Sequence, residues 1–259
     1  MHNITIIQAN LHWQNKAANL VMFEHKIAQI KETTDLIVLP EMYTTGFIME
    51  ATTYAETMAG STIQWMQRIA TSTNAVLCGS LIITENNQYY NRFIWMPPNG
   101  QVQYYDKKHL FGLGNENQHY TAGTTQLFTT LNGLVFNCQV CYDLRFPVWA
   151  RQPTTTALQY HVLLYVANWP EVRSAAWKAL LVARAIENQC YVVAVNRVGY
   201  DGNGTYHSGN SMVVSPMGEM LYHKADDEVL ATITLHISEV ETIRKKFPFL
   251  GDADKFMLG

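Results

Sequence analysis

The first part of the chain contains hydrophobic runs of two different periods. Residues 4–9 and 36–39 are short apolar runs of the kind that form buried strands. Residues 17–32 between them place apolar side chains three and four positions apart, which predicts an amphipathic helix with Leu20, Phe23, Ile27 and Ile30 on its buried face. The chain is therefore predicted to begin as strand, helix, strand.

The alternation of strands and helices continues to the end of the sequence. We expect helices at residues 61–70 and 174–188, and strands at 76–83, 91–96, 101–105, 133–140, 162–166, 191–196, 211–214 and 229–235. Residues 112–123 and 199–209 are predicted as long loops, where functional side chains are common. This pattern is typical of an α/β protein with a mixed sheet layered with helices.

Composition and charge indicate how many domains to expect and which kinds of partner to exclude. The 259 residues are 48% hydrophobic and 15% charged, which suits one domain over residues 1–259 with a sizeable core. The net charge is −3 and no run of five like charges occurs, so a nucleic-acid partner is not expected. No signal peptide and no apolar run of membrane-spanning length is evident, and we expect a cytoplasmic protein without membrane association.

Cys141 is the strongest candidate for a reactive residue. It follows the predicted strand 133–140, at the point where the strand pattern stops. Ligands of layered α/β folds commonly bind beyond the carboxyl ends of strands, whereas Cys78 and Cys190 lie within apolar runs. A lone cysteine is more often a buried core residue, so this position needs support from other residues.

Two further charged residues follow predicted strands in the same way. Glu41 comes directly after residues 36–40, and a carboxylate in a dry site could accept the proton of the Cys141 thiol. Lys107 follows the strand at 101–105, and a cation there could stabilise the oxyanion of a tetrahedral intermediate together with the backbone N–H of Tyr142. Taken alone, Glu41 could equally be a solvated loop acid, and two adjacent lysines such as Lys107 and Lys108 are most often part of a solvated surface.

Other chemistries have weaker support in the sequence. His109 could pair with a cysteine, but its neighbours Leu110 and Phe111 favour a packed structural role. Cys138 and Cys141 form a C-x-x-C, but in a strand residues three apart face opposite ways, which disfavours a dithiol. No metal-ligand spacing and no phosphate-binding glycine loop is present, so neither a metal nor a cofactor is expected.

Several motifs of the chain resemble those of the nitrilase, or carbon–nitrogen hydrolase, superfamily. The similar segments are LPEM at 39–42, KKHLF at 107–111, CYDLRFP at 141–147, ANWP at 167–170, RAIEN at 184–188 and NRVG at 196–199. They cover nearly the whole chain. The resemblance implies a four-layer α-β-β-α sandwich and a Glu41-Lys107-Cys141 triad. It also implies a second glutamate, Glu116, that orients Lys107 and the attacking water.

Within the superfamily, the chain looks most like the bacterial ω-amidases, which hydrolyse monoamides of short dicarboxylates such as 2-oxoglutaramate. A buried substrate carboxylate needs a cation, and Arg145 could supply it, or could instead pair with Asp143 or Glu171. Asn210 departs from the aspartate that relatives often have, which leaves a supporting contact in doubt. The resemblance also implies a homodimer, and the apolar C-terminal arm at 247–259 could dock on another surface.

We therefore expect an amidase that forms a thioester on Cys141 and binds a small amide as its substrate, without a cofactor. The alternatives are an amidase for N-carbamoyl amino acids or deaminated glutathione, a non-catalytic binding or scaffold homologue, and a thiol-redox protein that uses Cys138 and Cys141.

Overall fold

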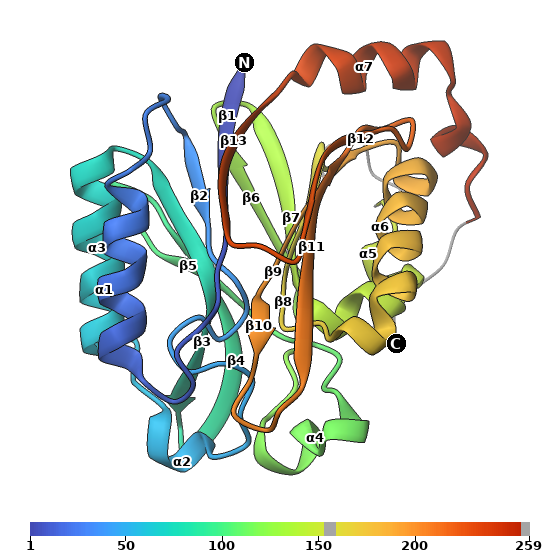
Figure 1. The fold of residues 1–259 in the computed structure, drawn as a ribbon. Helices are drawn as coiled ribbons and strands as arrows, with labels where there is room; N and C mark the ends of the chain where they lie inside the picture. The colour runs from blue at the N-terminus through green and yellow to red at the C-terminus, as the bar shows by residue number, and fades with distance from the viewer. Residues whose placement is uncertain (153–158, 255–259) are drawn as a thin grey trace.

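Two β-sheets form the centre of the computed structural model, which describes residues 1–152 and 159–254 (Figure 1). The six-stranded first sheet has the order β13-β1-β2-β3-β4-β5; the second runs β10-β11-β9-β8-β7-β6, with β12 paired to β11. Pairing is parallel within β1-β2-β3 and within β7-β8-β9, and antiparallel elsewhere. The strands are β1 (His2–Gln8), β2 (Leu36–Val38), β3 (Val76–Glu85), β4 (Gln88–Met96), β5 (Gln103–Asp106), β6 (Leu127–Leu131), β7 (Leu134–Val140), β8 (Val162–Ala167), β9 (Tyr191–Asn196), β10 (Val198–Tyr200), β11 (Tyr206–Val214), β12 (Met220–Ala225) and β13 (Val229–Leu235).

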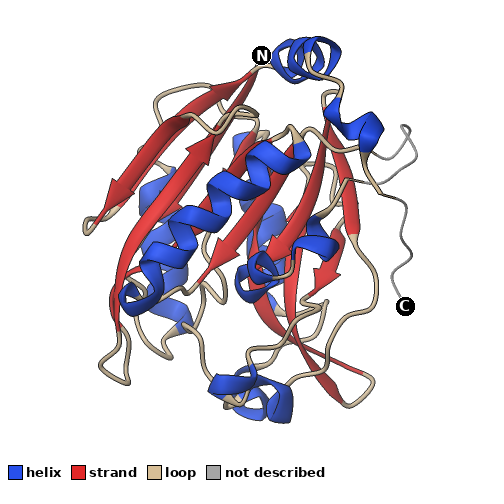
Figure 2. Ribbon diagram, turned by 90° about the vertical axis from the view of Figure 1, so that its right-hand side faces the viewer, coloured by secondary structure: helices blue, strands red, loops and turns tan. Residues whose placement is uncertain are grey.

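Helices cover the outer face of each sheet, so the fold has four layers in the order α-β-β-α (Figures 1 and 2). Phe23 of α1 and Met66 of α3 pack in one core cluster with Ile37 and Leu77 of the first sheet. Trp177 of α6 packs in another cluster with strands β8, β9 and β11 of the second sheet. The helices are α1 (Lys16–Ile27), α2 (Ala51–Tyr54), α3 (Ser61–Thr73), α4 (Glu116–His119), α5 (Pro147–Ala150), α6 (Ser174–Asn188) and α7 (Ile237–Lys246). The predicted four-layer sandwich is confirmed.

The inner faces of the two sheets pack directly against each other. Trp95 of β4 meets Phe136 of β7 with their ring centroids 5.2 Å apart. Strand β8 is buried at every position, as expected for a central parallel strand covered on both faces. Each large apolar side chain buried here contributes roughly 1.5–3 kcal/mol. The sheets therefore form a rigid frame for the residues at their edges.

Several predicted elements differ in extent from the structure. The first helix ends at Ile27 rather than at residue 32, because the chain then continues in tighter turns, with the N–H of Ile30 bonded to the Ile27 carbonyl. The predicted loop at 199–209 is wrong for most of its length, since β10 and β11 pair there as a hairpin. The other predicted loop, 112–123, contains the short helix α4.

The C-terminal part of the chain was only partly predicted. Helix α7 has no counterpart in the predicted elements, and the described chain then reaches Asp254 through a short helical turn at Phe249–Asp252. The last part of the predicted C-terminal arm, 255–259, lies outside the described residues, and a single domain over the whole chain stays a prediction. Within the described ranges, no helix has the length and apolar character needed to cross a membrane.

Candidate active site

Four strand ends of the two sheets meet at one place. Glu41 and Lys107 follow strands β2 and β5 of the first sheet, and Cys141 and Asn168 follow β7 and β8 of the second. The carboxyl ends of parallel strands share an edge of a sheet, which explains why residues distant in sequence converge here. The structure thus brings together the side chains that the sequence marked as a triad.

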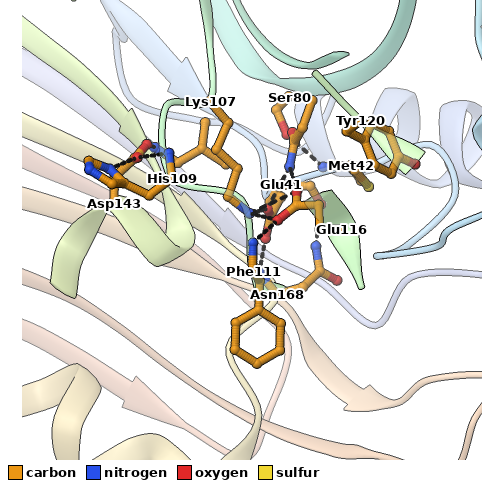
Figure 3. A network of polar contacts seen from close by, with 12 residues as sticks. Glu41, Met42, Ser80, Lys107, His109, Phe111, Glu116, Tyr120, Asp143 and Asn168 are labelled. Atoms are coloured by element: carbon orange, nitrogen blue, oxygen red, sulfur yellow. Dashed lines mark hydrogen bonds and ion pairs between the residues drawn. The ribbon is translucent and has the colours of Figure 1, made fainter. Parts of the chain in front are cut away.

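Lys107 lies at the centre of a buried charge cluster (Figure 3). Its Nζ is 3.0 Å from Glu41 Oε1, and 3.0 and 2.9 Å from the two carboxylate oxygens of Glu116. Lys107 is 1% exposed, and both glutamates are fully buried. Glu116, the first residue of α4, also accepts a hydrogen bond of 2.6 Å from the backbone N–H of Phe111. The second glutamate thus lies where it can orient Lys107.

Burial and charge act in opposite directions on this cluster. Burial lowers the pKa of Lys107, but Glu116 and Glu41 outweigh it, so the pKa lies above its ordinary value. Burial raises the pKa of Glu116, the Lys107 ammonium opposes this effect, and the charge of Glu41 adds to it. The lysine is therefore a cation at neutral pH.

Cys141 leaves strand β7 in an unusual backbone conformation. Its φ of 46° lies in the left-handed region, which non-glycine residues rarely adopt, and it begins the helical turn Cys141–Arg145. Burial raises the pKa of the thiol, the Glu41 carboxylate raises it further, and Lys107 opposes both. The resting group is therefore a neutral thiol that needs a base, and Glu41 is the carboxylate whose charge and hydrogen bonding act on it.

Tyr142 is the second residue of this helical turn. The first N–H groups of a helical turn have no partner within it, so the N–H of Tyr142 is a suitable donor to an oxyanion. Its ring packs edge-on against Phe111 and Phe146, with centroids 5.1 Å apart in both cases. The part of Tyr142 as an oxyanion donor stays a prediction.

His109 pairs with Asp143, and in the described part of the chain no hydrogen bond joins it to the Cys141 thiol. Its Nδ1 is 2.8 Å from Asp143 Oδ1, and its ring stacks on Phe146 with centroids 3.8 Å apart. Figure 3 shows this pair on the far side of Lys107 from the two glutamates. The geometry gives His109 the packed structural role that the sequence favoured.

A cavity of about 400 Å³ opens beside Cys141. Aromatic side chains form much of its wall, and Arg145, Arg173 and His207 supply polar groups. The guanidinium of Arg145 lies 4.8 Å over the ring of Trp169, and that of Arg173 lies 5.0 Å over Phe111. The aromatic lining residues are Trp13, Phe47, Phe111, Tyr142 and Trp169.

The ion pair of Arg145 with Asp143 or Glu171 is not formed among the residues that the structure describes. The oxygens of Asp143 accept hydrogen bonds from other donors, and no carboxylate in these ranges pairs with Arg145 or Arg173. The two guanidinium groups are partly removed from water, and the aromatic rings beneath them compensate this loss only in part. An anionic ligand would compensate the rest, so this wall of the cavity favours one.

Three residues of the site were missed as functional candidates. Asn91 donates through Nδ2 to Glu41 Oε1 at 2.8 Å and to Glu116 Oε1 at 3.2 Å. Asn168 donates from its backbone N–H to Glu41 Oε2 at 2.8 Å. A polar residue at a buried position of an apolar strand was the available indication for Asn91, while Asn168 and Arg173 follow the strand at 162–166.

The remaining residues in question lie away from this cluster. Cys138 is fully buried between the sheets. Burial and then the charge of Cys138 raise the pKa of Cys78, and both residues are free thiols. Asn210 donates to Ser208 Oγ at 2.7 Å, and its Oδ1 lies 2.7 Å from His223 Nε2. Asn210 therefore supports strand β11 and is not among the cavity-lining residues.

Comparisons with known proteins agree with this geometry. Residues 3–245 match the family model described as carbon-nitrogen hydrolase. The chain is 43% identical to the omega-amidase YafV of Escherichia coli K12, covering 98% of each chain, and 31% identical to the 2-oxoglutaramate amidase of Bacillus subtilis 168, covering 97% of each. A solved CN-hydrolase superfamily protein from Xanthomonas campestris superposes with a TM-score of 0.97, at 40% identity and full coverage of both chains. This chain belongs to the carbon–nitrogen hydrolase family.

Proposed function

We propose that this protein is an ω-amidase, which hydrolyses the terminal amide of short dicarboxylic acid monoamides such as 2-oxoglutaramate. The observation that carries the proposal is the buried Lys107 between Glu41 and Glu116, next to the Cys141 thiol and open to a cavity that bears unpaired arginines. The similarity to ω-amidases over nearly the full length supports the choice of substrate class.

The first half of the proposed reaction forms a thioester. Glu41 takes the proton of the thiol as Cys141 Sγ attacks the amide carbonyl carbon. The Lys107 charge and the Tyr142 N–H stabilise the oxyanion of the tetrahedral intermediate. When the carbonyl re-forms, the carbon–nitrogen bond breaks, and Glu41 passes its proton to the nitrogen, which leaves as ammonia.

The second half consumes water. Glu41 takes a proton from a water molecule, whose oxygen attacks the thioester carbonyl in the same oxyanion site. The carbon–sulfur bond then breaks, Glu41 returns the proton to Cys141 Sγ, and the dicarboxylate is released. Glu116 keeps Lys107 in place by accepting hydrogen bonds of 3.0 and 2.9 Å from its Nζ. In the proposed reaction Glu116 also helps to orient the attacking water.

The far end of the substrate is proposed to meet Arg145 and Arg173. Both guanidinium groups line the same cavity as Cys141, and the described residues give neither of them a carboxylate partner. Bidentate guanidinium–carboxylate pairing is among the stronger recognition contacts in proteins. The two arginines would therefore favour amides that carry a second, ionised carboxyl group.

The test is ammonia release from 2-oxoglutaramate, succinamate and an N-carbamoyl amino acid, measured with the wild type, Cys141→Ala and Cys138→Ser. We expect turnover of the first two substrates, no turnover by Cys141→Ala and near-normal turnover by Cys138→Ser. Undiminished activity of Cys141→Ala would refute the mechanism, and equal loss in Cys138→Ser would favour the thiol-redox alternative. Preference for the carbamoyl substrate would refute the substrate class alone.

A homodimer and a cytoplasmic location are part of the same proposal. Apolar side chains on the second-sheet side of the molecule are solvent-exposed in the single chain, among them Val172 and Phe249. Light scattering of the purified protein tests the dimer, and a monomer would remove it. Fractionation of the cells that produce the protein tests the location.

A further inference from the structure

Asp143 is a fully buried carboxylate whose two oxygens receive four hydrogen bonds. Oδ1 accepts from the backbone N–H of His109 at 3.0 Å and lies 2.8 Å from its Nδ1. Oδ2 accepts from the hydroxyl of Tyr105 at 2.8 Å and from the backbone N–H of Val140 at 3.0 Å. A carboxylate with this many donors is held in one orientation.

These donors flank the reacting groups in both sheets. Tyr105 lies in β5 of the first sheet, two residues before Lys107, and His109 lies two residues after it, in the segment that follows β5. Val140 directly precedes Cys141, at the end of β7 in the second sheet. One side chain therefore links the lysine loop to the nucleophile loop across the junction of the sheets.

A second set of hydrogen bonds extends this link. The Tyr105 hydroxyl, which donates to Asp143, also accepts from the backbone N–H of Lys108 and from Trp149 Nε1, each at 3.0 Å. The loop is thus fixed on both sides of Lys107. Asp143 itself is the next residue after Tyr142, so the backbone N–H proposed to contact the oxyanion is fixed by the same carboxylate.

We propose that Asp143 is a positioning residue that sets the distance between Lys107 and the Tyr142 N–H, the two groups that stabilise the oxyanion. This inference rests on the proposed acyl transfer at Cys141, and it concerns the geometry of the oxyanion site only. Asp143 does not touch the substrate and exchanges no proton with it. Its effect reaches the reaction through the backbone positions of the two loops.

Replacing the carboxylate by its amide is the most selective change. Asp143→Asn keeps the size of the side chain, but an NH₂ group takes the place of one carboxylate oxygen. An NH₂ group cannot accept hydrogen bonds, so the two donors that face this position lose their partner. The segments around Lys107 and Cys141 are then no longer held at their wild-type separation. An oxyanion site is sensitive to such shifts, because its donors act only at hydrogen-bonding distance from the developing charge.

Two reactions of Cys141 separate the oxyanion site from the thiol. Acylation by p-nitrophenyl acetate passes through an oxyanion, whereas alkylation by iodoacetamide displaces iodide and forms none. For Asp143→Asn we expect the acylation burst to slow roughly 10- to 1,000-fold, as for the loss of an oxyanion donor, while the alkylation rate stays within about threefold of wild type. Equal slowing of both reactions would overturn the proposal, because it would mean general damage to the site. An unchanged burst would overturn it as well.

A double-mutant cycle tests the connection to Lys107. If Asp143 acts by placing the lysine, Asp143→Asn should cost much less in a Lys107→Met background than in the wild type. Fully additive losses would mean that Asp143 acts independently of Lys107. Urea denaturation gives the folded fraction of each variant under the assay conditions, so a loss of folded protein is not mistaken for a loss of rate.

His109 offers a matched pair of variants in the same network. His109→Asn keeps an N–H donor near Asp143 but loses the stacking on Phe146, whereas His109→Phe keeps the stacking and loses the donor. We expect His109→Phe to slow acylation several-fold more than His109→Asn; the reverse order would contradict the link through Asp143. Since these assays use an ester, they remain informative if dicarboxylate amides are not the substrates.

Discussion

Asn168 and Glu41 are joined by two hydrogen bonds that cross from one sheet to the other. The backbone N–H of Asn168 donates to Glu41 Oε2 at 2.8 Å, and the Asn168 side-chain amide donates to the backbone carbonyl of Glu41. The carboxylate proposed as the base is thus fixed at its head group and at its main chain. Its other oxygen receives Lys107 and Asn91.

Replacement of Asn168 should therefore weaken the base without removing it. Asn168→Ala deletes the bond to the Glu41 carbonyl but keeps the backbone N–H, so we expect kcat for the amide substrate to fall roughly 10-fold, with a smaller change in KM. Steady-state kinetics with 2-oxoglutaramate measure this split. A KM effect without a kcat effect would place Asn168 in substrate binding instead.

Asn91 bridges the two buried glutamates and carries no charge. Asn91→Asp would add a third carboxylate beside a single ammonium, and an unpaired buried charge is strongly destabilising. We expect a loss of roughly 3 kcal/mol or more in the free energy of unfolding at neutral pH, measured by urea denaturation. Asn91→Ser, which is neutral, serves as the control and should lose less; equal losses in the two variants would argue against the charge effect.

Arg173 should control selectivity for the charged end of the substrate. Arg173→Met keeps most of the side-chain length and its packing on Phe111 but removes the cation. We expect kcat/KM for succinamate to fall roughly 10- to 100-fold, the value of a charged hydrogen bond, while that for the neutral amide butyramide changes little. Arg145→Met is the companion variant. Parallel losses on both substrates would show that the arginine supports the fold of the site rather than the carboxylate.

Because the pKa of Cys141 is raised in the folded protein, we expect the free energy of unfolding to decrease at alkaline pH. Burial, and then the charge of Glu41, raise the pKa of the thiol well above its ordinary value of 9.0. Below pH 9.0 both folded and unfolded chains keep the proton, so this contribution to stability is complete. Above it the unfolded thiol ionises first, and the free energy of unfolding falls as pH rises towards the folded pKa.

Cys141→Ala isolates this contribution. Between about pH 9.5 and 10.5, the free energy of unfolding of the wild type should fall more steeply than that of the variant, by about 1.4 kcal/mol per pH unit. Guanidinium unfolding at several pH values measures both slopes. Identical slopes would mean that the thiol ionises equally easily in the folded and unfolded states.

The local hydrophobic period predicted the elements well where a segment has a clear helical or strand pattern of its own. Helix α6 has the predicted bounds, and the predicted strands are present with shifts of up to three residues at their ends, except that β11 begins at Tyr206, five residues before the predicted strand. Helix α1 was predicted five residues too long, because apolar spacing continued to Ile30 while hydrogen bonding changed after Ile27. Strand β11 of the β10–β11 hairpin pairs with β9, which is distant in the sequence. The local sequence pattern does not indicate such a partner, so the hairpin was not predicted.

The sequence predicted those residues of the site that come directly after a strand or belong to a family motif. Glu41, Lys107, Glu116 and Cys141 were singled out on those grounds, and the structure places them together, although their catalytic roles stay predictions. Asn91 was not singled out, because its function depends on which residues lie across from it in the folded protein. The network of Asp143 was missed for the same reason.

The division of the site between the sheets makes activity a property of the whole molecule. The proposed base and lysine come from the first sheet, and the nucleophile comes from the second. A chain cut between β5 and β6 would yield two fragments, each lacking half of the chemistry. Amide hydrolysis by the mixed fragments would then show that the two fragments have reassembled, so the activity itself would measure their association.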